Sequence, residues 1–385
     1  MQKYNKNSQL KIAIFLSYRD PKEGGGYTIT NDIFNELLKY PKKNIIFIVL
    51  NDKNNYLFSK IKKLGFHCKC FNENKIKIKF KNLFFSSFPF FLRIYNKFGF
   101  NKYLNFQLNN KISIVWFISA EYYFPLFAKY ISTVWDLQHI THSTFPETGS
   151  FFRKIYRSVV IKSFLCNSFK IITGSKILIR ILKKNYKIDI TKFIYNPHPT
   201  PQIFIKEKRK KKYFNYKNYF LYPANFWRHK NHENLLKAFE LFNYEHHYKY
   251  KLILVGDIKD FSYYNHLKKK FKKKLNKNFI ILNFVSTNYL INLYDNCLGL
   301  IYSSFAGPEN LPPLEAMARK KNIICSKYPG ATEQLGNVPF YFDPNNYLSI
   351  KKALSLFVKS KVKKFFFIRK TSNYINEVLN GIKYF

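Results

Sequence analysis

The stretch GPENLPPLEAM, residues 307–317, joins a stiff loop to the start of a helix. Its two proline-containing pairs, Gly307-Pro308 and Pro312-Pro313, are incompatible with the interior of a helix or a central strand. The following letters predict a helix from position 314, with proline near its first residue and Glu315 in its first turn. Backbone N–H groups at such a helix start can bind phosphate, and a carboxylate there can accept hydrogen bonds from ribose hydroxyls. An ordinary turn stiffened by proline explains the stretch equally well.

The segments around this loop predict a parallel sheet. An apolar strand at 298–302 precedes the loop and another at 323–326 follows the helix, which makes a βαβ unit. Upstream the same alternation continues, with strands at 219–222, 251–255 and 280–284 and helices at 231–242, 263–271 and 289–296. Ligands of such sheets collect at the carboxyl ends of the strands. The loop at 307 therefore lies where a ligand is expected.

The first half of the chain shows the same alternation. A strand at 11–16, the triplet Gly24–Gly26 and a helix at 27–38 come first; strands at 44–50, 112–117, 132–135 and 170–173 and a helix at 151–164 follow. A proline-rich segment at 194–201 marks a domain boundary. We therefore predict an α/β protein of two Rossmann-like, doubly wound domains facing across a cleft. The first spans residues 1–198, and the second spans residues 199–385 and includes a basic helical tail.

The charge balance is strongly basic. The chain has 66 Lys and Arg against 22 Asp and Glu, a net charge of +44. Nucleic acid or an anionic membrane are the partners that such a charge suggests. The lysines are spread along the whole chain, however, together with abundant Asn, Ile, Phe and Tyr, which is the bias of an A/T-rich genome. We therefore attribute about half of the excess charge to composition and expect the rest to favour an acidic lipid surface or phosphate-rich ligands.

The cysteines and apolar segments indicate the compartment. Five cysteines have no pairing pattern, and the pair Cys68 and Cys70 has no second pair to complete a zinc site. The N-terminus lacks an apolar signal core. The most apolar stretch, residues 112–135, is interrupted by charged residues and proline, so buried strands explain it better than a membrane span. A cytoplasmic protein is expected, with peripheral contact at the inner face of the cytoplasmic membrane.

Two loops of the first domain carry candidate ligand-binding residues. Gly25 and Gly26 would let the backbone approach a phosphate, although a simple turn uses glycine as readily. Asp136 and His139 follow a buried strand. Asp136 is expected to orient His139, and the imidazole would then bond a substrate hydroxyl or phosphate. A surface histidine without a function is the alternative.

A loop of the second domain offers two cations. Arg228 and Lys230 lie between the strand at 219–222 and the next helix, and together provide a planar fork and a point charge for a diphosphate. A capped helix with exposed bases is the competing interpretation. Because this loop shares a sheet edge with the loop at 307, we favour phosphate binding. No pair of loop carboxylates is arranged for a divalent cation, so no metal cofactor is expected.

Taken together, three segments of the second domain resemble the retaining glycosyltransferases of family 4, which have the GT-B fold. They are YPANFWRHKNHENLLKAF at 222–239, GPENLPPLEAMA at 307–318 and PGATEQLG at 329–336. The first domain adds VWDLQH at 134–139 and FPE at 145–147. The resemblance is strong over residues 220–344 and moderate over 133–175. It is specific to the family but not to one sugar.

The resemblance implies roles for individual residues. Lys230, with Arg228 nearby, would hold the diphosphate of the donor, and Glu315 its ribose. The backbone of Asn310 and Leu311 would meet the transferred sugar or the phosphate, and Gly25 and Gly26 would border the phosphate from the opposite domain. His139 would lie near the reacting sugar and stabilise developing charge. The diphosphate itself would assist a front-side displacement that retains the anomeric configuration.

The loop at 307 departs from the family pattern. The pattern has two glutamates separated by seven residues, and the place of the first is taken by Gly307, preceded by Ala306. Glu309 is six positions from Glu315 instead of eight, so it is not assumed to replace the first glutamate. The acid that would contact the sugar is therefore missing.

The expected function is the transfer of a hexose from a GDP- or UDP-linked donor to a glycan or lipid-linked acceptor. Cell-surface polysaccharide synthesis is the expected setting, and mannosyl- and glucosyltransferases are the nearest activities. A GT-B relative that is not a transferase, such as an epimerase or an inactive scaffold, is the main alternative. A basic nucleic-acid-binding protein is a further one, but no recognition motif for nucleic acid is present.

Overall fold

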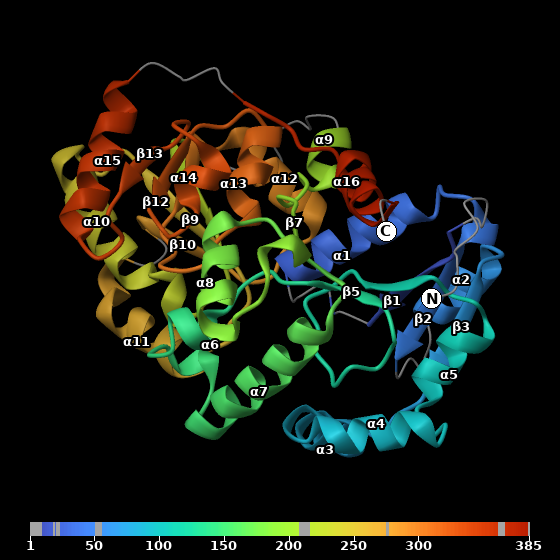
Figure 1. Ribbon diagram of the computed structural model, residues 1–385. Helices are drawn as coiled ribbons and strands as arrows, with labels where there is room; N and C mark the ends of the chain where they lie inside the picture. Colours follow the sequence, from blue (N-terminus) through green and yellow to red (C-terminus); the bar gives the residue numbers. More distant parts are fainter. Residues whose placement is uncertain are drawn as a thin grey trace.

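A computed structural model describes residues 10–17, 20, 24–50, 56–207, 216–274, 277–360 and 366–383. It contains a seven-stranded sheet of order β3-β2-β1-β4-β5-β6-β7 and a six-stranded sheet of order β10-β9-β8-β11-β12-β13, each covered by helices (Figure 1). Every strand pair is parallel. The predicted pair of doubly wound α/β domains is therefore confirmed.

The first sheet lies between residues 12 and 195. Its strands are β1 (Ile12–Leu16), β2 (Ile45–Leu50), β3 (His67–Phe71), β4 (Ile114–Phe117), β5 (Tyr130–Thr133), β6 (Lys170–Thr173) and β7 (Phe193–Tyr195). Its helices are α1 (Gly25–Leu37), α2 (Tyr56–Lys63), α3 (Lys75–Ser87), α4 (Pro89–Lys97), α5 (Lys102–Asn109), α6 (Gln138–Thr141), α7 (Phe151–Asn167) and α8 (Lys176–Tyr186). Strand β1 is buried along its whole length because it pairs on both sides and is covered on both faces. The strand order reverses between β1 and β4, which opens a crevice at their carboxyl ends.

The second sheet follows the short linker helix α9 (Gln202–Lys206). Its strands are β8 (Tyr219–Pro223), β9 (Lys251–Val255), β10 (Phe279–Leu282), β11 (Gly299–Tyr302), β12 (Ile323–Ser326) and β13 (Phe340–Phe342). Its helices are α10 (His232–Glu245), α11 (Phe261–Lys270), α12 (Thr287–Asn296), α13 (Leu311–Ala318), α14 (Ala331–Leu335) and α15 (Tyr347–Lys359). Leu221 of β8 lies between Ile253 of β9 and Leu300 of β11, so here the order reverses at β8 and β11.

Helix α13 begins earlier than predicted. It starts at Leu311 rather than at position 314, and both prolines lie at its N-terminus. Proline is tolerated there because the first N–H groups of a helix have no intrahelical acceptor. Glu315 consequently lies beyond the first turn, not within it.

The C-terminal tail returns to the first domain. Helix α16 (Thr371–Lys383) packs beside α1, as Figure 1 shows for the red and blue helices. Asn196 donates to the carbonyl of Tyr374 at 2.9 Å. The two crossing segments also bond each other, since Thr200 N–H donates to the carbonyl of Arg369 at 2.9 Å. The division at 198/199 stays a prediction, but the tail helix lies on the first domain.

None of the helices in the described ranges combines the length and the apolar character that crossing a bilayer requires.

Candidate functional site

A cleft of about 540 Å³ lies between the carboxyl edges of the two sheets. It brings together seven of the nine residues predicted for the site: Gly25, Gly26, Asp136, Lys230, Asn310, Leu311 and Glu315. Gln138, His198 and His229 also line it. Arg228 and His139 do not line the cleft. The loops that carry the site residues follow strands β1, β5, β8 and β11, because the crevices of both sheets open toward each other.

Lys230 is the one lysine or arginine among the described residues that line the cleft. Its ammonium donates to the Tyr302 hydroxyl at 2.9 Å. No carboxylate among the described residues forms an ion pair with it. Burial lowers the pKa of Lys230 to about 8, although the negative charges of Asp136 and Glu147 oppose this shift. A buried cation bonded only to a hydroxyl is suited to an anionic ligand such as a diphosphate.

A chain of polar contacts leads from Lys230 to the loop at 307. The Tyr302 hydroxyl donates to Asn310 Oδ1 at 2.7 Å, and Asn310 Nδ2 donates to the carbonyl of Gly307 at 3.1 Å. Gly307 has φ +107°, and a Cβ there would lie 2.7 Å from Asn310 Oδ1. An acidic side chain at 307 is therefore incompatible with this arrangement, because the Asn310 amide occupies its place.

The backbone of Asn310 is already bonded. Its N–H donates to Gln334 Oε1 at 3.0 Å, and its carbonyl accepts from Gln334 Nε2 at 2.7 Å. This arrangement differs from the expectation that the Asn310 backbone meets the sugar or phosphate. Leu311 is the first residue of α13 and packs against Gly25, where an added Cβ would lie 3.3 Å from Leu311 Cδ1. Glycine at 25 thus permits a close approach of the two domains.

Glu315 presents a carboxylate from helix α13. Its Oε2 accepts a hydrogen bond from the Tyr294 hydroxyl at 2.8 Å. Burial raises the pKa of Glu315 to about 7, against the lowering effect of the Tyr294 bond. Tyr294 therefore fixes one oxygen. The other oxygen has no hydrogen bond from the described residues and remains an acceptor for a ligand hydroxyl.

Glu309 has a different environment from Glu315. Its two oxygens accept from the N–H of His198 at 3.0 and 3.2 Å, and Arg369 Nη1 lies 3.3 Å from Oε1. Burial raises the pKa of Glu309 to about 8, and Arg369 partly opposes the shift. A Cβ on Gly174 would lie 1.5 Å from Oε2, so the carboxylate lies directly against that backbone. Glu309 therefore joins the loop to both crossing segments.

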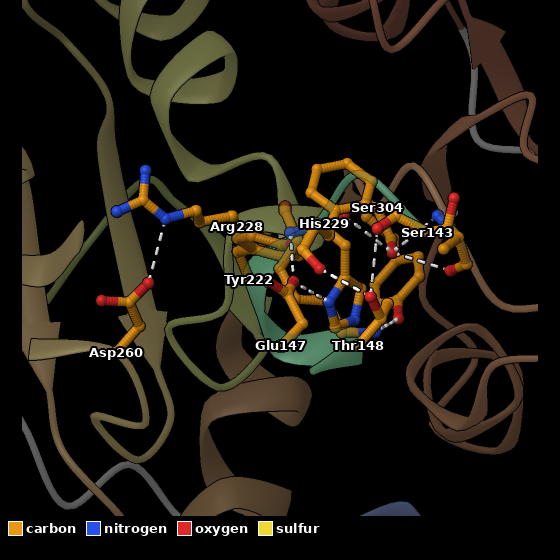
Figure 2. A network of polar contacts seen from close by, with 12 residues as sticks. Ser143, Glu147, Thr148, Tyr222, Arg228, His229, Asp260 and Ser304 are labelled. Carbon is orange, nitrogen blue, oxygen red and sulfur yellow. Dashed lines mark hydrogen bonds and ion pairs between the residues drawn. The ribbon is translucent and has the colours of Figure 1, made fainter. Parts of the chain in front are cut away.

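Glu147 connects the two domains at the other side of the cleft. Its Oε1 accepts from the N–H of His229 at 2.9 Å and lies 2.5 Å from the His229 ring Nδ1 (Figure 2). Burial alone would raise the pKa of Glu147, but the two bonds from His229 outweigh it and lower the pKa. Glu147 belongs to the segment FPE at 145–147, for which no such contact was predicted. No pattern of neighbouring residues indicates this partner, which is 82 residues away in the sequence.

Arg228 lies outside the cleft. Its Nε donates to Asp260 Oδ2 at 3.0 Å, and its guanidinium lies 5.4 Å from the centre of the Tyr263 ring. Figure 2 shows the side chain extending toward Asp260, away from His229. The predicted pair of cations therefore separates. Lys230 faces the cleft, and Arg228 holds the loop through its bond to Asp260 outside the cleft.

Asp136 and His139 do not form the expected pair. Asp136 Oδ1 accepts from the N–H of Gln138 at 3.1 Å, which begins α6. The His139 ring is buried, and neither of its nitrogens has a hydrogen-bond partner in the described part of the chain. Burial and the positive charge of Arg157 lower the pKa of His139 to about 4, so the imidazole is neutral at pH 7. Asp136 lines the cleft, and His139 lies behind it.

Comparisons with known proteins identify a family match in the second half of the chain. Residues 204–374 match the family model described as Glycosyl transferases group 1. O-antigen chain mannosyltransferase RfbU of Salmonella typhimurium is 28% identical over 232 residues, which are 60% of this chain and 61% of the relative. The match thus spans about three fifths of that relative's length.

Solved structures resemble nearly the whole chain. A glycosyltransferase of Rickettsia africae has a TM-score of 0.62 at 18% identity, covering 97% of this chain and 94% of its own. Anabaena HepE in complex with UDP and glucose has a TM-score of 0.61 at 13% identity, and the match covers 98% of this chain and 100% of the HepE chain. At such identities the likeness establishes the fold, which is GT-B.

Proposed function

We propose that this chain, which has the GT-B fold and carries a Glycosyl transferases group 1 domain, transfers a hexose from a nucleoside-diphosphate sugar to a glycan or lipid-linked acceptor. The observation that carries the proposal is the meeting of Lys230, Glu315 and the start of α1 in one cleft. A basic group, a ribose acceptor and free helix amides are the three contacts that a nucleoside diphosphate needs.

Each contact has a proposed role. Lys230 neutralises the charge that develops on the leaving diphosphate, and the first-turn amides of α1 at Gly25 and Gly26 bond its oxygens. The free oxygen of Glu315 accepts from a ribose hydroxyl. Leu311 packs over the glycine turn and excludes water from the diphosphate. Asp136 contacts the transferred sugar from the first domain.

The proposed reaction retains the anomeric configuration. The bond between sugar C1 and the diphosphate oxygen breaks as the acceptor oxygen bonds C1 from the same face. The acceptor's hydroxyl proton passes to a diphosphate oxygen. The family resemblance supports this course, and so does Lys230, which stabilises the departing group most when its charge is greatest.

The donor is proposed to be a GDP- or UDP-linked hexose, and the setting a cell-surface polysaccharide. The mannosyltransferase relative favours mannose, and its O-antigen product favours a lipid-linked glycan as acceptor. HepE, with UDP and glucose bound, supports a nucleoside diphosphate in this fold. His139 can take part only if its ring reaches the cleft, which we propose as a step of donor binding.

The test is a thermal-shift screen of GDP-mannose, UDP-glucose, UDP-galactose and dTDP-glucose, followed by transfer assays with the donor that binds. The one-bond coupling between C1 and H1 of the transferred sugar, which differs between the two anomers, then reports retention or inversion. If calorimetry finds no binding of any nucleotide sugar to the folded protein, the proposal is wrong.

The missing acid at 306 and 307 favours one second candidate, a GT-B protein that binds a nucleotide sugar without transferring it. A donor that binds, is not transferred to any acceptor, and returns as its epimer would identify an epimerase. Binding with no chemical change would identify a scaffold.

A further inference from the structure

Helices α3 and α4 expose a group of neighbouring apolar side chains, not only single scattered ones. Six side chains make up this surface, which we call the aromatic face: Ile76, Phe80, Phe88, Phe90, Phe91 and Ile94. Ile76 is 78% exposed, Phe80 70% and Phe90 66%. Contiguous exposed apolar patches on a monomer mark interaction sites.

The aromatic face is continuous across the turn between the two helices. The ring of the partly buried Phe84 lies 6.2 Å from Phe80, 5.6 Å from Phe88 and 5.4 Å from Phe91. Phe91 in turn lies 5.8 Å from Phe90. The rings thus pack on one another at the surface and form a single patch.

The core does not need these side chains. Helix α3 buries a different face, made of Ile78, Asn82 and Phe85, and α4 buries Leu92. A helix at the surface of a domain normally has one apolar stripe. Here each helix has a second one, which faces outward.

The charge around the aromatic face is uniformly positive. Lys75, Lys77, Lys79, Arg93 and Lys97 are exposed on the same two helices. The chain has no Asp or Glu between Glu73 and Glu121. Helix α7 packs beside α3, and Figure 1 shows α3, α4 and α7 together along the lower margin of the first domain. Helix α7 itself begins with an exposed aromatic pair, Phe151 and Phe152, 71% and 81% exposed, followed by Arg153.

We propose that the aromatic face binds the surface of a bilayer that contains anionic phospholipid. Phenylalanine rings enter the boundary between headgroups and acyl chains, while lysine and arginine contact lipid phosphates. An acidic protein would match the charge, but two outward apolar stripes flanked by lysine match the layered polarity of a lipid interface. The proposal goes beyond sugar transfer and does not depend on it.

The test is co-sedimentation of the full chain with vesicles. Wild-type protein is expected to pellet with phosphatidylcholine vesicles that contain about 30% phosphatidylglycerol, and far less with phosphatidylcholine alone. The triple variant Phe80→Ser, Phe90→Ser, Phe91→Ser is expected to bind at least about tenfold less. The matched control, Tyr244→Ser, Phe261→Ser, Leu348→Ser, changes equally exposed residues of the second domain and should bind within about twofold of wild type.

A charge series separates this surface from the overall positive charge. Lys77→Gln, Lys79→Gln, Arg93→Gln should weaken binding about tenfold or more, whereas Lys268→Gln, Lys269→Gln, Lys272→Gln in the second domain should not. Equal losses in both triples would overturn the proposal, because the attraction would then be non-specific. Circular dichroism melting checks that each variant is folded.

A second measurement reports insertion directly. Brominated phosphatidylcholine in mixed vesicles is expected to quench the tryptophan fluorescence of Phe90→Trp more than that of the wild-type protein, which contains three tryptophans. The control Phe261→Trp is expected to show no such additional quenching. If Phe90→Trp is not quenched, the aromatic face does not enter the bilayer. A different outcome is that the wild-type protein does not bind vesicles but forms a dimer, and that the triple serine variant is a monomer. The aromatic face would then be a contact between two copies of the chain, and the proposal would be wrong.

Discussion

The Glu147 carboxylate of the first domain lies 2.5 Å from the ring Nδ1 of His229 in the second domain and accepts the His229 N–H at 2.9 Å. His229 precedes Lys230, the cation of the cleft, within one short turn. The position of Lys230 relative to the first domain therefore depends on a residue that belongs to neither its sheet nor its loop.

Replacing Glu147 should separate the two edges of the cleft. We expect Glu147→Ala to lower kcat/KM for transfer about tenfold to a hundredfold, and the free energy of unfolding by about 1–3 kcal/mol, because the buried N–H of His229 loses its acceptor. Steady-state kinetics and urea unfolding measure the two effects. Glu240→Ala, which removes a partly exposed ion-pair partner of Lys274, is the control and should change neither. Unaltered kinetics in Glu147→Ala would show that this contact does not position Lys230.

Donor binding should depend on pH through Lys230. Its pKa of about 8 in the free protein means that binding of UDP, which needs the ammonium form, takes up a proton above pH 8. We expect the dissociation constant to be flat below pH 8 and to rise about tenfold per pH unit above it, until the higher pKa of the bound state is reached. Calorimetry at pH 7.5 and 9.5, in buffers of different ionisation enthalpy, measures both the affinity and the proton uptake.

A test variant and its control for this experiment are available in one 3₁₀ turn, at Lys230 and Arg228. Lys230→Met should abolish transfer, weaken UDP binding about 10- to 100-fold and remove the pH dependence, because the charge is gone. Arg228→Met, two residues away, should leave UDP binding within about threefold, since its side chain bonds Asp260 outside the cleft. A larger loss for Arg228→Met than for Lys230→Met would reverse the assignment of the diphosphate site.

Glu315 should reduce the stability of the empty protein at neutral pH. Its folded pKa of about 7 lies above the value of 4.5 expected when unfolded, so the folded state keeps a proton that the unfolded state has lost. Stability therefore falls as pH rises from 4.5 to 7. We expect Glu315→Gln to be about 1–3 kcal/mol more stable than wild type at pH 8 and nearly equal at pH 5.

Unfolding by urea at the two pH values checks this, with the exposed Glu245→Gln as control. The same Glu315→Gln protein should lose transfer, because an amide holds a ribose hydroxyl less strongly than a carboxylate does. A variant that gained no stability at pH 8 would show that the Glu315 carboxylate is not destabilising, and one that kept full turnover would remove it from the donor site.

The contact of Glu309 with Gly174 can be tested by adding one methyl group. Gly174→Ala places a Cβ 1.5 Å from the present position of Glu309 Oε2, so the carboxylate must leave the N–H of His198. We expect a loss of about 1–3 kcal/mol in the free energy of unfolding. In the double variant Gly174→Ala, Glu309→Ala the two losses should not add, because the second change removes the clash. Additive losses would mean that the two residues do not meet.

Much of the fold was predictable because its strands are apolar runs bounded by turn residues. The strands at 251–255 and 323–326 were predicted at their observed bounds, and those at 219–222, 280–284 and 298–302 to within a few residues, whereas β13 was not predicted. The residues from 67 to 109 contain no apolar run bounded by turn residues from which their elements could be predicted. Helix α3 carries the alternation Lys-Ile-Lys-Ile-Lys-Phe, which is typical of a strand, yet packing of Ile78, Asn82 and Phe85 makes it a helix.

For the site, local patterns identified the loops but not the direction of each side chain. Both Arg228 and Lys230 follow β8, and only the 3₁₀ turn over these residues sends one toward Asp260 and the other toward Tyr302. The pairing of Asp136 with His139 failed for a related reason. Asp136 satisfies the N–H of Gln138 at the start of α6, which leaves the buried imidazole without it.

The amino-acid sequence was sufficient for the two doubly wound sheets and for the loops that meet at their carboxyl ends, because periodicity and turn chemistry are properties of neighbouring residues. Which residues contact each other across the cleft could be identified only from the tertiary structure. Glu147 meets His229 at a separation of 82 residues, and Glu309 meets His198 at 111. Such contacts depend on how the two domains pack, and this packing commits Glu309 to the linkers between them. Within the second domain, the contacts of Asn310 with Tyr302, Gly307 and Gln334 place its amide where an acid was expected.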